Sequence, residues 1–352
     1  MKNIFVFGYY GFDNAGDEII LKEIVNSLKE SDTSFYILTY NYIRTKKRTG
    51  ENPVSRSKFI NVIKSIMKSD IVVGGGGSLI QDVTSSKSLY YYLGLITLGK
   101  ICRKKVLFLF SGFGPVKGKF NRFLTRFILN KIDYIVLRDR LSEDFLKDLK
   151  INVPYKLAGD AAFLRDKICF HKENKSAKEK VVGISLRKWT SNKKVLEEVS
   201  KVINYLVEKG YTIKLIPMKF PDDYDYMKGL MDSDNEKISI IDDYKEFDDL
   251  CNVLGQCEFI IGMRLHSLIL SALVGKPMIG LSYDPKIDGF LESFQQINHG
   301  KVENIDFERL KKDITLLEDN YEYYENTVVE KTKEMKNINS EVIKEVKDKF
   351  IQ

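Results

Sequence analysis

Short apolar runs alternate with longer amphipathic segments along most of the chain, and this alternation limits the possible folds strongly. Apolar runs of roughly four to eight residues are typical of buried parallel strands, and segments with apolar residues at helical spacing are typical of the helices between them. Asp17 to Lys29 is such a helical segment, because Ile20 and Ile24 recur at that spacing. The pattern predicts an α/β protein built from βα units. The apolar runs are "NIFVFG", "SFYILTY", "DIVVGGGG", "KVLFLFSGFG" and "YIVLRD" in the first half, and "VVGISL", "TIKLIPM", "ISII", "CEFIIGM" and "PMIGLSY" in the second.

The alternation stops once, over residues 166–180, where "DKICFHKENKSAKEK" is polar, rich in lysine and without a period. This break predicts a linker between an N-terminal α/β domain over 1–165 and a C-terminal α/β domain over 181–305. The charged segment over 306–352 keeps apolar residues at helical spacing and predicts helices packed on the body. A chain of 352 residues suits roughly two domains. We expect two doubly wound, Rossmann-like domains that face a cleft, with ligands at the carboxyl ends of the strands.

Composition argues against several classes of protein. The net charge is +7, from 56 basic and 49 acidic residues spread along the chain, which does not indicate a nucleic-acid partner. The four cysteines form no CxxC pair and no metal-ligand spacing with the three histidines. We therefore expect a reduced, cytoplasmic protein without a metal site or cofactor. We expect no cleavable leader, because the first apolar run breaks at Asp13 without a small-residue cleavage site, and no run reaches the roughly 18 apolar residues of a membrane span.

Two stretches combine apolar and basic residues, "YLGLITLGK" over 92–100 and "FNRFLTRFILNKI" over 120–132. They are typical either of buried helix faces or of contact with a membrane surface.

The strand-to-helix junction in "FIIGMRLHSLILSALVGKPMIGLSYDPK" holds the strongest candidate site. Arg264 and His266 follow a strand, and the free N–H groups of the next helix favour an anion. Lys286 follows the next strand and adds a positive charge. Together they predict a pocket for a small, multiply charged anion. The alternative is that His266 is satisfied by backbone groups and that Lys286 is a surface lysine.

Other strand ends carry weaker signals. Four consecutive glycines in "VVGGGGSLIQD" allow close approach of the backbone to a ligand at Gly76 and Ser78, but they match no nucleotide-binding motif. A tight turn in which Ser78 caps a helix is the alternative. Arg138 and Arg187 each follow a strand, where they either bind an anion or lie on the surface.

The opening stretch "GYYGFDNAGDEII" is polar between a strand and a helix. Asp17 and Glu18 suit the first turn of a helix, and Asp13 or Asn14 suits its cap. The alternative is that this loop faces the cleft. Asp13 and Asn14 would then contact a substrate there, and Tyr9, Tyr10 and Phe12 would either stack on sugar faces or simply pack.

Four segments carry a resemblance to a known family. "GYYGFDNAGDEIIL", "GGGGSLIQD", "LAGDAAF" and "GMRLHSLILSALVGKPMIGLSYDPK" resemble the polysaccharide pyruvyltransferase family, in particular its cell-wall branch of the CsaB type. The resemblance implies a fold like that of GT-B glycosyltransferases and phosphoenolpyruvate as donor. It also implies a pyruvyl ketal on N-acetylmannosamine of a lipid-linked secondary cell-wall polymer, with the enzyme in the cytoplasm or at the inner face of the membrane. "GDAAF" departs from the family at a turn, where a proline more often follows the aspartate.

The resemblance assigns roles to particular residues. Arg264, Leu265 and His266 correspond to donor contacts, and Arg138 and Lys286 are further candidates. Protonation of the donor's methylene carbon needs a general acid, for which His266 is the expected residue. Arg187 would help to hold the donor anion.

On the acceptor side, Asp13 would take the proton of the attacking hydroxyl. The expected acceptor contacts are Asn14, Tyr10, Gly76 and Ser78. Two other classes remain open, a nucleotide-sugar glycosyltransferase and a noncatalytic sensor of phosphoenolpyruvate or sugar.

Overall fold

The computed structural model describes residues 2–83, 85–165, 180–190, 192–232, 235–244 and 247–352. Its chain divides into two compact units. The first comprises Met1–Arg165 with Met335–Gln352, and the second comprises Asp166–Glu334. Residues 166–179 of the predicted linker lie outside the described residues.

The first unit is built on a parallel sheet in the order β3-β2-β1-β4-β6-β7-β8, and β5 pairs with β6. The chain winds outward from β1 in one direction and from β4 in the other, so this is a doubly wound sheet. The strands are β1 (Lys2–Phe7), β2 (Thr33–Thr39), β3 (Asn52–Ser55), β4 (Ile71–Gly75), β5 (Ser78–Ile80), β6 (Lys105–Phe113), β7 (Tyr134–Leu137) and β8 (Tyr155–Leu157).

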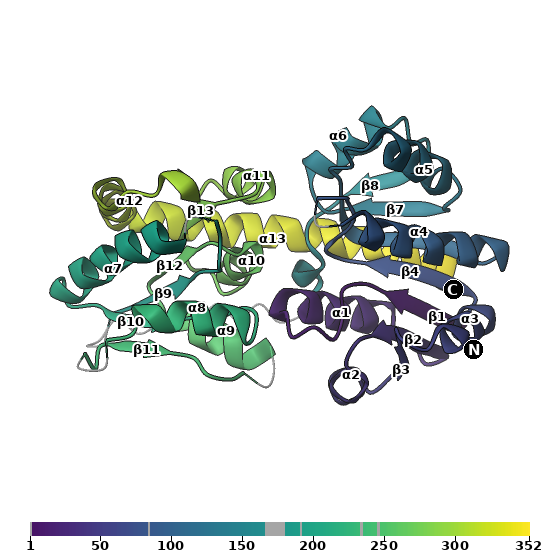
Figure 1. The fold of residues 1–352 in the computed structure, drawn as a ribbon, viewed down its shortest axis with the longest axis horizontal. Helices are drawn as coiled ribbons and strands as arrows, with labels where there is room; N and C mark the ends of the chain where they lie inside the picture. Colours follow the sequence, from purple (N-terminus) through teal and green to yellow (C-terminus); the bar gives the residue numbers. More distant parts are fainter. Residues whose placement is uncertain (1, 84, 166–179, 191, 233–234, 245–246) are drawn as a thin grey trace. The chain divides into compact units, whose positions relative to one another are not determined.

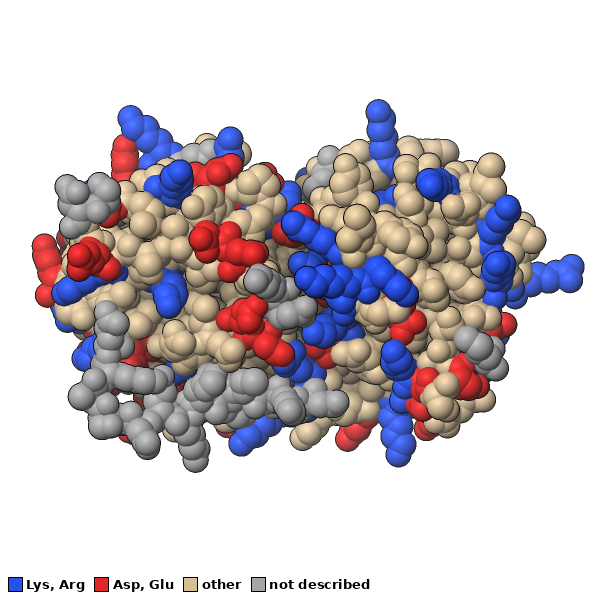
Figure 2. All heavy atoms as spheres, turned by 90° about the horizontal axis from the view of Figure 1, so that it is seen from below, with Lys and Arg blue, Asp and Glu red and all other residues tan. Residues whose placement is uncertain are grey.

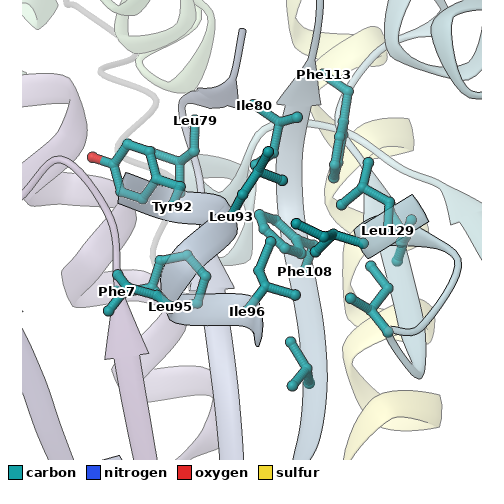
Figure 3. Close-up of a cluster of buried hydrophobic side chains, with 14 of the residues drawn as sticks. Phe7, Leu79, Ile80, Tyr92, Leu93, Leu95, Ile96, Phe108, Phe113 and Leu129 are labelled. Carbon is teal, nitrogen blue, oxygen red and sulfur yellow. The ribbon is translucent and has the colours of Figure 1, made fainter. Parts of the chain in front are cut away.

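Helices cover both faces of this sheet (Figure 1). Successive side chains of a strand point to opposite faces, so Phe5 and Phe7 belong to one core cluster while Ile4 and Val6 belong to another. Figure 3 shows Phe7 and Phe108 in the first cluster. The helices are α1 (Ala15–Leu28), α2 (Tyr42–Thr49), α3 (Phe59–Lys68), α4 (Ser86–Ile101), α5 (Lys119–Leu129) and α6 (Arg140–Asp148).

The second unit repeats this architecture with a parallel sheet in the order β11-β10-β9-β12-β13-β14. Together the two sheets confirm the predicted α/β fold with doubly wound parallel sheets. The strands are β9 (Val181–Ser185), β10 (Thr212–Leu215), β11 (Ile238–Ile240), β12 (Phe259–Gly262), β13 (Met278–Ser282) and β14 (Ile297–Lys301). The helices are α7 (Asn192–Glu208), α8 (Asp222–Met227), α9 (Phe247–Gly255), α10 (Leu265–Leu273), α11 (Pro285–Ser293) and α12 (Phe307–Asp319).

The last long helix, α13 (Tyr321–Val346), is divided between the two units. In the second unit, the Thr332 hydroxyl donates to the carbonyl of Ala272 at 2.9 Å. In the first unit, the Asn339 side chain accepts from Gly159 N and donates to Asp160 O, each at 2.8 Å. The segment predicted to pack on the body therefore contributes to both units. No helix in the described part of the chain combines the length and the apolar character needed to cross a bilayer.

Candidate active site

Each sheet has one switch point, where the chain changes its direction of winding. In the first unit it lies between β1 and β4, and in the second between β9 and β12. Ligands of doubly wound sheets bind at the carboxyl ends of the strands beside such a point. The loop after β1 carries Tyr10, Asp13 and Asn14, and the junction after β12 carries Arg264 and His266. Most of the predicted site residues thus follow the strands at a switch point. The predicted cleft between the two domains stays a prediction.

Tyr10 lies inside the first unit. Its side chain is 1% exposed, and its hydroxyl donates to Gly75 O at 2.7 Å. Gly8 makes room for the ring, since a Cβ there would come within 2.3 Å of Tyr10 Cζ. The ring ties the loop after β1 to the end of β4, so the expectation that Tyr10 contacts the acceptor finds no support in this placement.

Asp13 has a left-handed backbone, with φ of 57°. Its carboxylate forms an ion pair with Arg44, and about a third of its side chain is exposed (31%). Aspartate and asparagine tolerate this conformation better than most residues. Asp13 is therefore both partly open to solvent and paired with a cation.

The start of α1 differs from the predicted cap. Asn14 occupies the N-cap position, but it makes no side-chain capping bond and instead donates to the Asp17 carboxylate. Glu18 accepts from Gly11 N at 2.6 Å and lies 3.1 Å from Arg48. Burial raises the pKa of Glu18, and this effect outweighs the attraction of Arg48.

The glycine loop after β4 packs closely on α1. Gly76 and Gly77 have φ of 60° and 62°, and a Cβ on Gly76 would lie 1.9 Å from Ile20 Cγ2. The Ser78 hydroxyl, in β5, lies 3.3 Å from Arg138 Nη2 and accepts its hydrogen bond. The alternative that Ser78 caps a helix is wrong, because Ser85 caps α4.

Arg138 is buried, with 8% of its surface exposed. Its Nη1 and Nε lie 3.2 and 3.3 Å from the carboxylates of Asp160 and Asp139. Burial disfavours its charge, but the attraction of the two carboxylates outweighs burial and raises the pKa. The alternative of a surface arginine is wrong. Arg138 links Asp160 and Asp139 to β5, and its charge is compensated within the first unit.

Tyr9 and Phe12 of the opening stretch lie in an aromatic stack whose other members, Tyr40 and Arg56, the sequence did not reveal. The rings of Tyr9 and Phe12 are 4.2 Å apart and nearly parallel, and Phe12 lies 4.9 Å from Tyr40. Tyr9 and Tyr40 are 38% and 70% exposed. The guanidinium of Arg56 lies 5.4 Å from the Phe12 ring centre and 4.5 Å from that of Tyr91. Flat, exposed rings of this kind suit the apolar faces of sugars.

In the second unit, Arg264 is held by an acid that the sequence did not reveal. Its Nε and Nη2 each donate to one oxygen of Asp223 at 2.5 Å. Asp223 is 1% exposed and also accepts from Met218 N and Lys219 N. A guanidinium has five N–H donors, and Asp223 takes two of them in a fixed orientation.

His266 and Leu265 begin α10, with Arg264 at the N-cap. His266 is half-buried in the first turn, where a helix dipole favours an anion. Leu265 is 7% exposed and belongs to the core, so it can offer a ligand mainly its backbone. The Ser267 hydroxyl donates to Arg264 O at 2.7 Å and fixes the turn.

Arg187 follows β9, on the other side of the switch point. Its Nη1 donates to the Tyr283 hydroxyl at 2.9 Å, and its guanidinium lies 4.6 Å from the centre of the Tyr283 ring and 5.4 Å from that of Trp189. It forms no ion pair with any residue that the structure describes. Two buried atoms, Ser185 Oγ and Arg187 Nε, have no hydrogen-bond partner among the described residues.

Lys286 lies in the first turn of α11, 3.2 Å from Asp284 Oδ2. Asp284 also caps this helix by accepting from Lys286 N at 3.1 Å. The charges of Arg264 and Lys286 are thus partly neutralised within the second unit. Arg187, the third cation predicted there, has no acidic partner among the residues that the structure describes.

The described residues contain no group of three or more His, Cys, Asp or Glu side chains arranged to hold a metal ion.

On the face drawn in Figure 2, acidic side chains lie among the lysine and arginine side chains.

Similarity to solved structures defines the class of fold. UDP-GlcNAc 2-epimerase from Neisseria meningitidis, bound to UDP-GlcNAc, has a TM-score of 0.70 at 14% identity, covering 99% of this chain and all of that one. Anabaena Alr3699/HepE with UDP-glucose gives 0.66 at 12% identity, with 99% and 100% coverage. The spinosyn rhamnosyltransferase SpnG gives 0.60 at 12%, with the same coverage. The fold is that of the two-domain GT-B glycosyltransferases and related epimerases, and identities this low show the fold alone.

The sequence identifies the family within that class. Residues 14–285 match the polysaccharide pyruvyl transferase family, and the chain belongs to it. The amylovoran biosynthesis protein AmsJ of Erwinia amylovora is 27% identical over 251 residues, which are 63% of this chain and 59% of that protein. The aligned part thus spans less than two thirds of this relative's length.

Proposed function

We propose that the protein transfers the pyruvyl group of phosphoenolpyruvate to two hydroxyls of one sugar and forms a ketal. The observation that carries this proposal is the junction after β12, where Arg264 and His266 begin a helix within the region of the family match. The sugar we propose is N-acetylmannosamine of a lipid-linked secondary cell-wall polymer, as in the CsaB-type branch. The reaction would take place in the cytoplasm or at the inner face of the membrane.

The donor would bind at the switch point of the second unit. Arg187 offers a positive charge that no acidic side chain among the described residues neutralises. The first turn of α10 adds N–H groups and the positive end of a helix dipole. A phosphate or carboxylate oxygen that accepts from Arg187 Nε or Ser185 Oγ would satisfy a buried donor, whose isolation costs about 1–3 kcal/mol. Arg264, oriented by Asp223, has further N–H groups for the same anion.

His266 would act as the general acid. It gives a proton to the methylene carbon of phosphoenolpyruvate, and a sugar hydroxyl attacks the adjacent carbon. The bond from that carbon to the phosphate oxygen then breaks, and a second sugar hydroxyl closes the ring as it loses its proton. Asp13 passes the proton of the attacking hydroxyl to the departing phosphate, and the proton of the second hydroxyl restores His266, so the sum is phosphoenolpyruvate plus sugar giving ketal plus inorganic phosphate.

The acceptor would bind at the switch point of the first unit. The stack of Tyr9, Phe12 and Tyr40 offers an exposed aromatic surface for a sugar ring. Asp13 would accept the proton of the attacking hydroxyl, and its pair with Arg44 would have to open or turn aside. Asn14 and the Ser78 region would orient the sugar. Glu18, whose pKa burial raises, is the second candidate for the base.

Two measurements on the purified protein test this function. Phosphate release from phosphoenolpyruvate is measured with and without a panel of sugar acceptors, including lipid-linked N-acetylmannosamine, and the product is examined for a pyruvyl ketal by mass spectrometry. Thermal stability is measured with phosphoenolpyruvate, UDP-N-acetylglucosamine and UDP-glucose. We expect stabilisation by phosphoenolpyruvate without added metal, weakening with salt. Stabilisation by a UDP-sugar alone would favour a nucleotide-sugar glycosyltransferase, which so far has the support of the fold only.

A further inference from the structure

Helix α5 of the first unit exposes a row of three phenylalanines. Phe120, Phe123 and Phe127 are 66%, 66% and 53% exposed. Their spacing of three and four residues places them on one side of the helix. The rings of Phe123 and Phe127 stack with centres 6.4 Å apart. We call these three residues, with the flanking Lys119 and Arg126, the α5 surface.

The opposite side of α5 is anchored, so the exposed side has a fixed orientation. Thr125 and Leu129 are fully buried, and Leu129 belongs to the core of the first unit. At the start of the helix, Asp82 accepts from Lys117 N, Gly118 N and Asn121 Nδ2 at 2.9–3.2 Å. The phenylalanines therefore point outward from a well-anchored helix.

The other apolar-basic stretch of the sequence behaves differently. Leu93, Leu95 and Ile96 of α4 are at most 3% exposed and pack in the core (Figure 3). That stretch is a buried helix face. Of these two stretches, the one on α5 keeps its apolar row exposed, and exposed apolar rows of this kind mark interaction surfaces.

The charges around the row are mostly positive. Lys119 and Arg126 are exposed beside the phenylalanines, and Lys131 Nζ lies 3.8 Å from the centre of the Phe127 ring. The nearby acids are engaged, since Asp82 binds the start of α5 and Asp148 lies 2.7 Å from Arg122. An apolar row with cationic flanks is complementary to a bilayer with anionic headgroups.

We propose that the α5 surface docks the protein on an anionic lipid bilayer. The phenylalanines enter the boundary between headgroups and acyl chains, and Lys119, Arg126 and Lys131 lie at the lipid phosphates. A second copy of the chain fits less well, because a symmetric contact would bring the same cations together. The docking does not depend on the proposed pyruvyl transfer. It would hold the loop before α4 close to the bilayer, since Asp82 of that loop binds the start of α5.

The test is flotation of the whole chain with vesicles of phosphatidylcholine and phosphatidylglycerol, compared with vesicles of phosphatidylcholine alone. We expect binding to the anionic vesicles that weakens with salt. The variant Phe120→Ser, Phe123→Ser, Phe127→Ser should bind weaker by on the order of tenfold per phenylalanine. The variant Lys119→Gln, Arg126→Gln should bind weaker by roughly fivefold per charge.

Helix α3 provides a matched control. Phe59, Ile60 and Met67 are 64%, 67% and 60% exposed, and the helix also carries Lys64 and Lys68. The variant Phe59→Ser, Ile60→Ser, Met67→Ser should bind vesicles like the wild type. Circular dichroism and thermal melting confirm that each variant is folded.

Two results would overturn the proposal. The first is wild-type binding by the α5 variant together with loss in the α3 variant, which would assign the docking to α3. The second is a wild type that ignores anionic vesicles and sediments as a dimer that the α5 substitutions dissociate, which would make this surface a contact between two copies.

Discussion

Asp223 binds the guanidinium of Arg264 with both carboxylate oxygens, each at 2.5 Å. The arginine that we propose as a donor contact is thus held by a carboxylate that is itself 1% exposed. Such a pair fixes the direction of the guanidinium while reducing its net charge. Orientation and anion binding can therefore be separated by substitution.

For this pair we predict different effects on stability and on donor binding. Arg264→Ala leaves Asp223 buried without its partner and should lower the free energy of unfolding by roughly 3–5 kcal/mol. Adding Asp223→Ala should recover much of that stability, but should not recover binding of phosphoenolpyruvate. Urea unfolding and calorimetric titration of both variants provide the measurements. Donor binding by the double variant at wild-type strength would remove Arg264 from the site.

Replacement of His266 tests the general acid. We expect His266→Gln to retain phosphoenolpyruvate binding but to slow phosphate release by roughly 10²- to 10⁴-fold, because the side chain no longer delivers a proton. Single-turnover release of phosphate separates chemistry from binding. Turnover close to that of the wild type would assign the proton to another group.

Substitutions of Asp13 and Arg44 can be compared as a matched pair, because these two residues form one ion pair. Asp13→Asn keeps a side chain that tolerates φ of 57°, so the fold should persist, while transfer should slow by roughly 10²- to 10⁴-fold if the carboxylate is the base. Arg44→Gln breaks the same ion pair but keeps the carboxylate, and should retain most of the activity. Equal losses in the two variants would mean that the pair shapes the loop and that Asp13 moves no proton.

Glu18 should make stability depend on pH. Because burial raises its pKa in the folded state, its protonated form favours folding, and this contribution is lost as the pH rises through the folded pKa. At a pH below about 4, under its usual pKa, wild type and Glu18→Gln should differ little. Above the folded pKa the wild type should be the less stable of the two. The measurement is urea unfolding of both proteins over a pH series, and a difference that does not change with pH would contradict the assignment.

The sequence predicted where those residues of the candidate site lie that come just after an apolar run. Arg187, Arg264 and His266 lie at the ends of β9 and β12 because a buried strand ends where polar residues begin. The α/β fold followed from the same alternation. These patterns depend on residues that are close in sequence, so tertiary packing does not change where the strands end.

Partners that are distant in sequence could not be predicted. Asp223 is 41 residues from Arg264 and comes from a helix between β10 and β11. Tyr10 and Tyr40 are both loop tyrosines, and only the packing decides that one turns into the core and the other outward. Whether an arginine keeps its charge available likewise depends on tertiary contacts, as Arg138 shows with Asp160 and Asp139.

The division of α13 has a consequence for synthesis of the protein. Val342, Ile343 and Val346 help to close one hydrophobic core of the first unit, and they are made after the entire second unit. N-terminal domains usually fold as they leave the ribosome, but here the core that α1 begins to cover stays incomplete until α13 has been made. We expect the nascent first unit to remain sensitive to proteases, or bound to chaperones, until α13 emerges. Ribosome-bound chains halted before and after residue 346 would differ sharply in protease resistance.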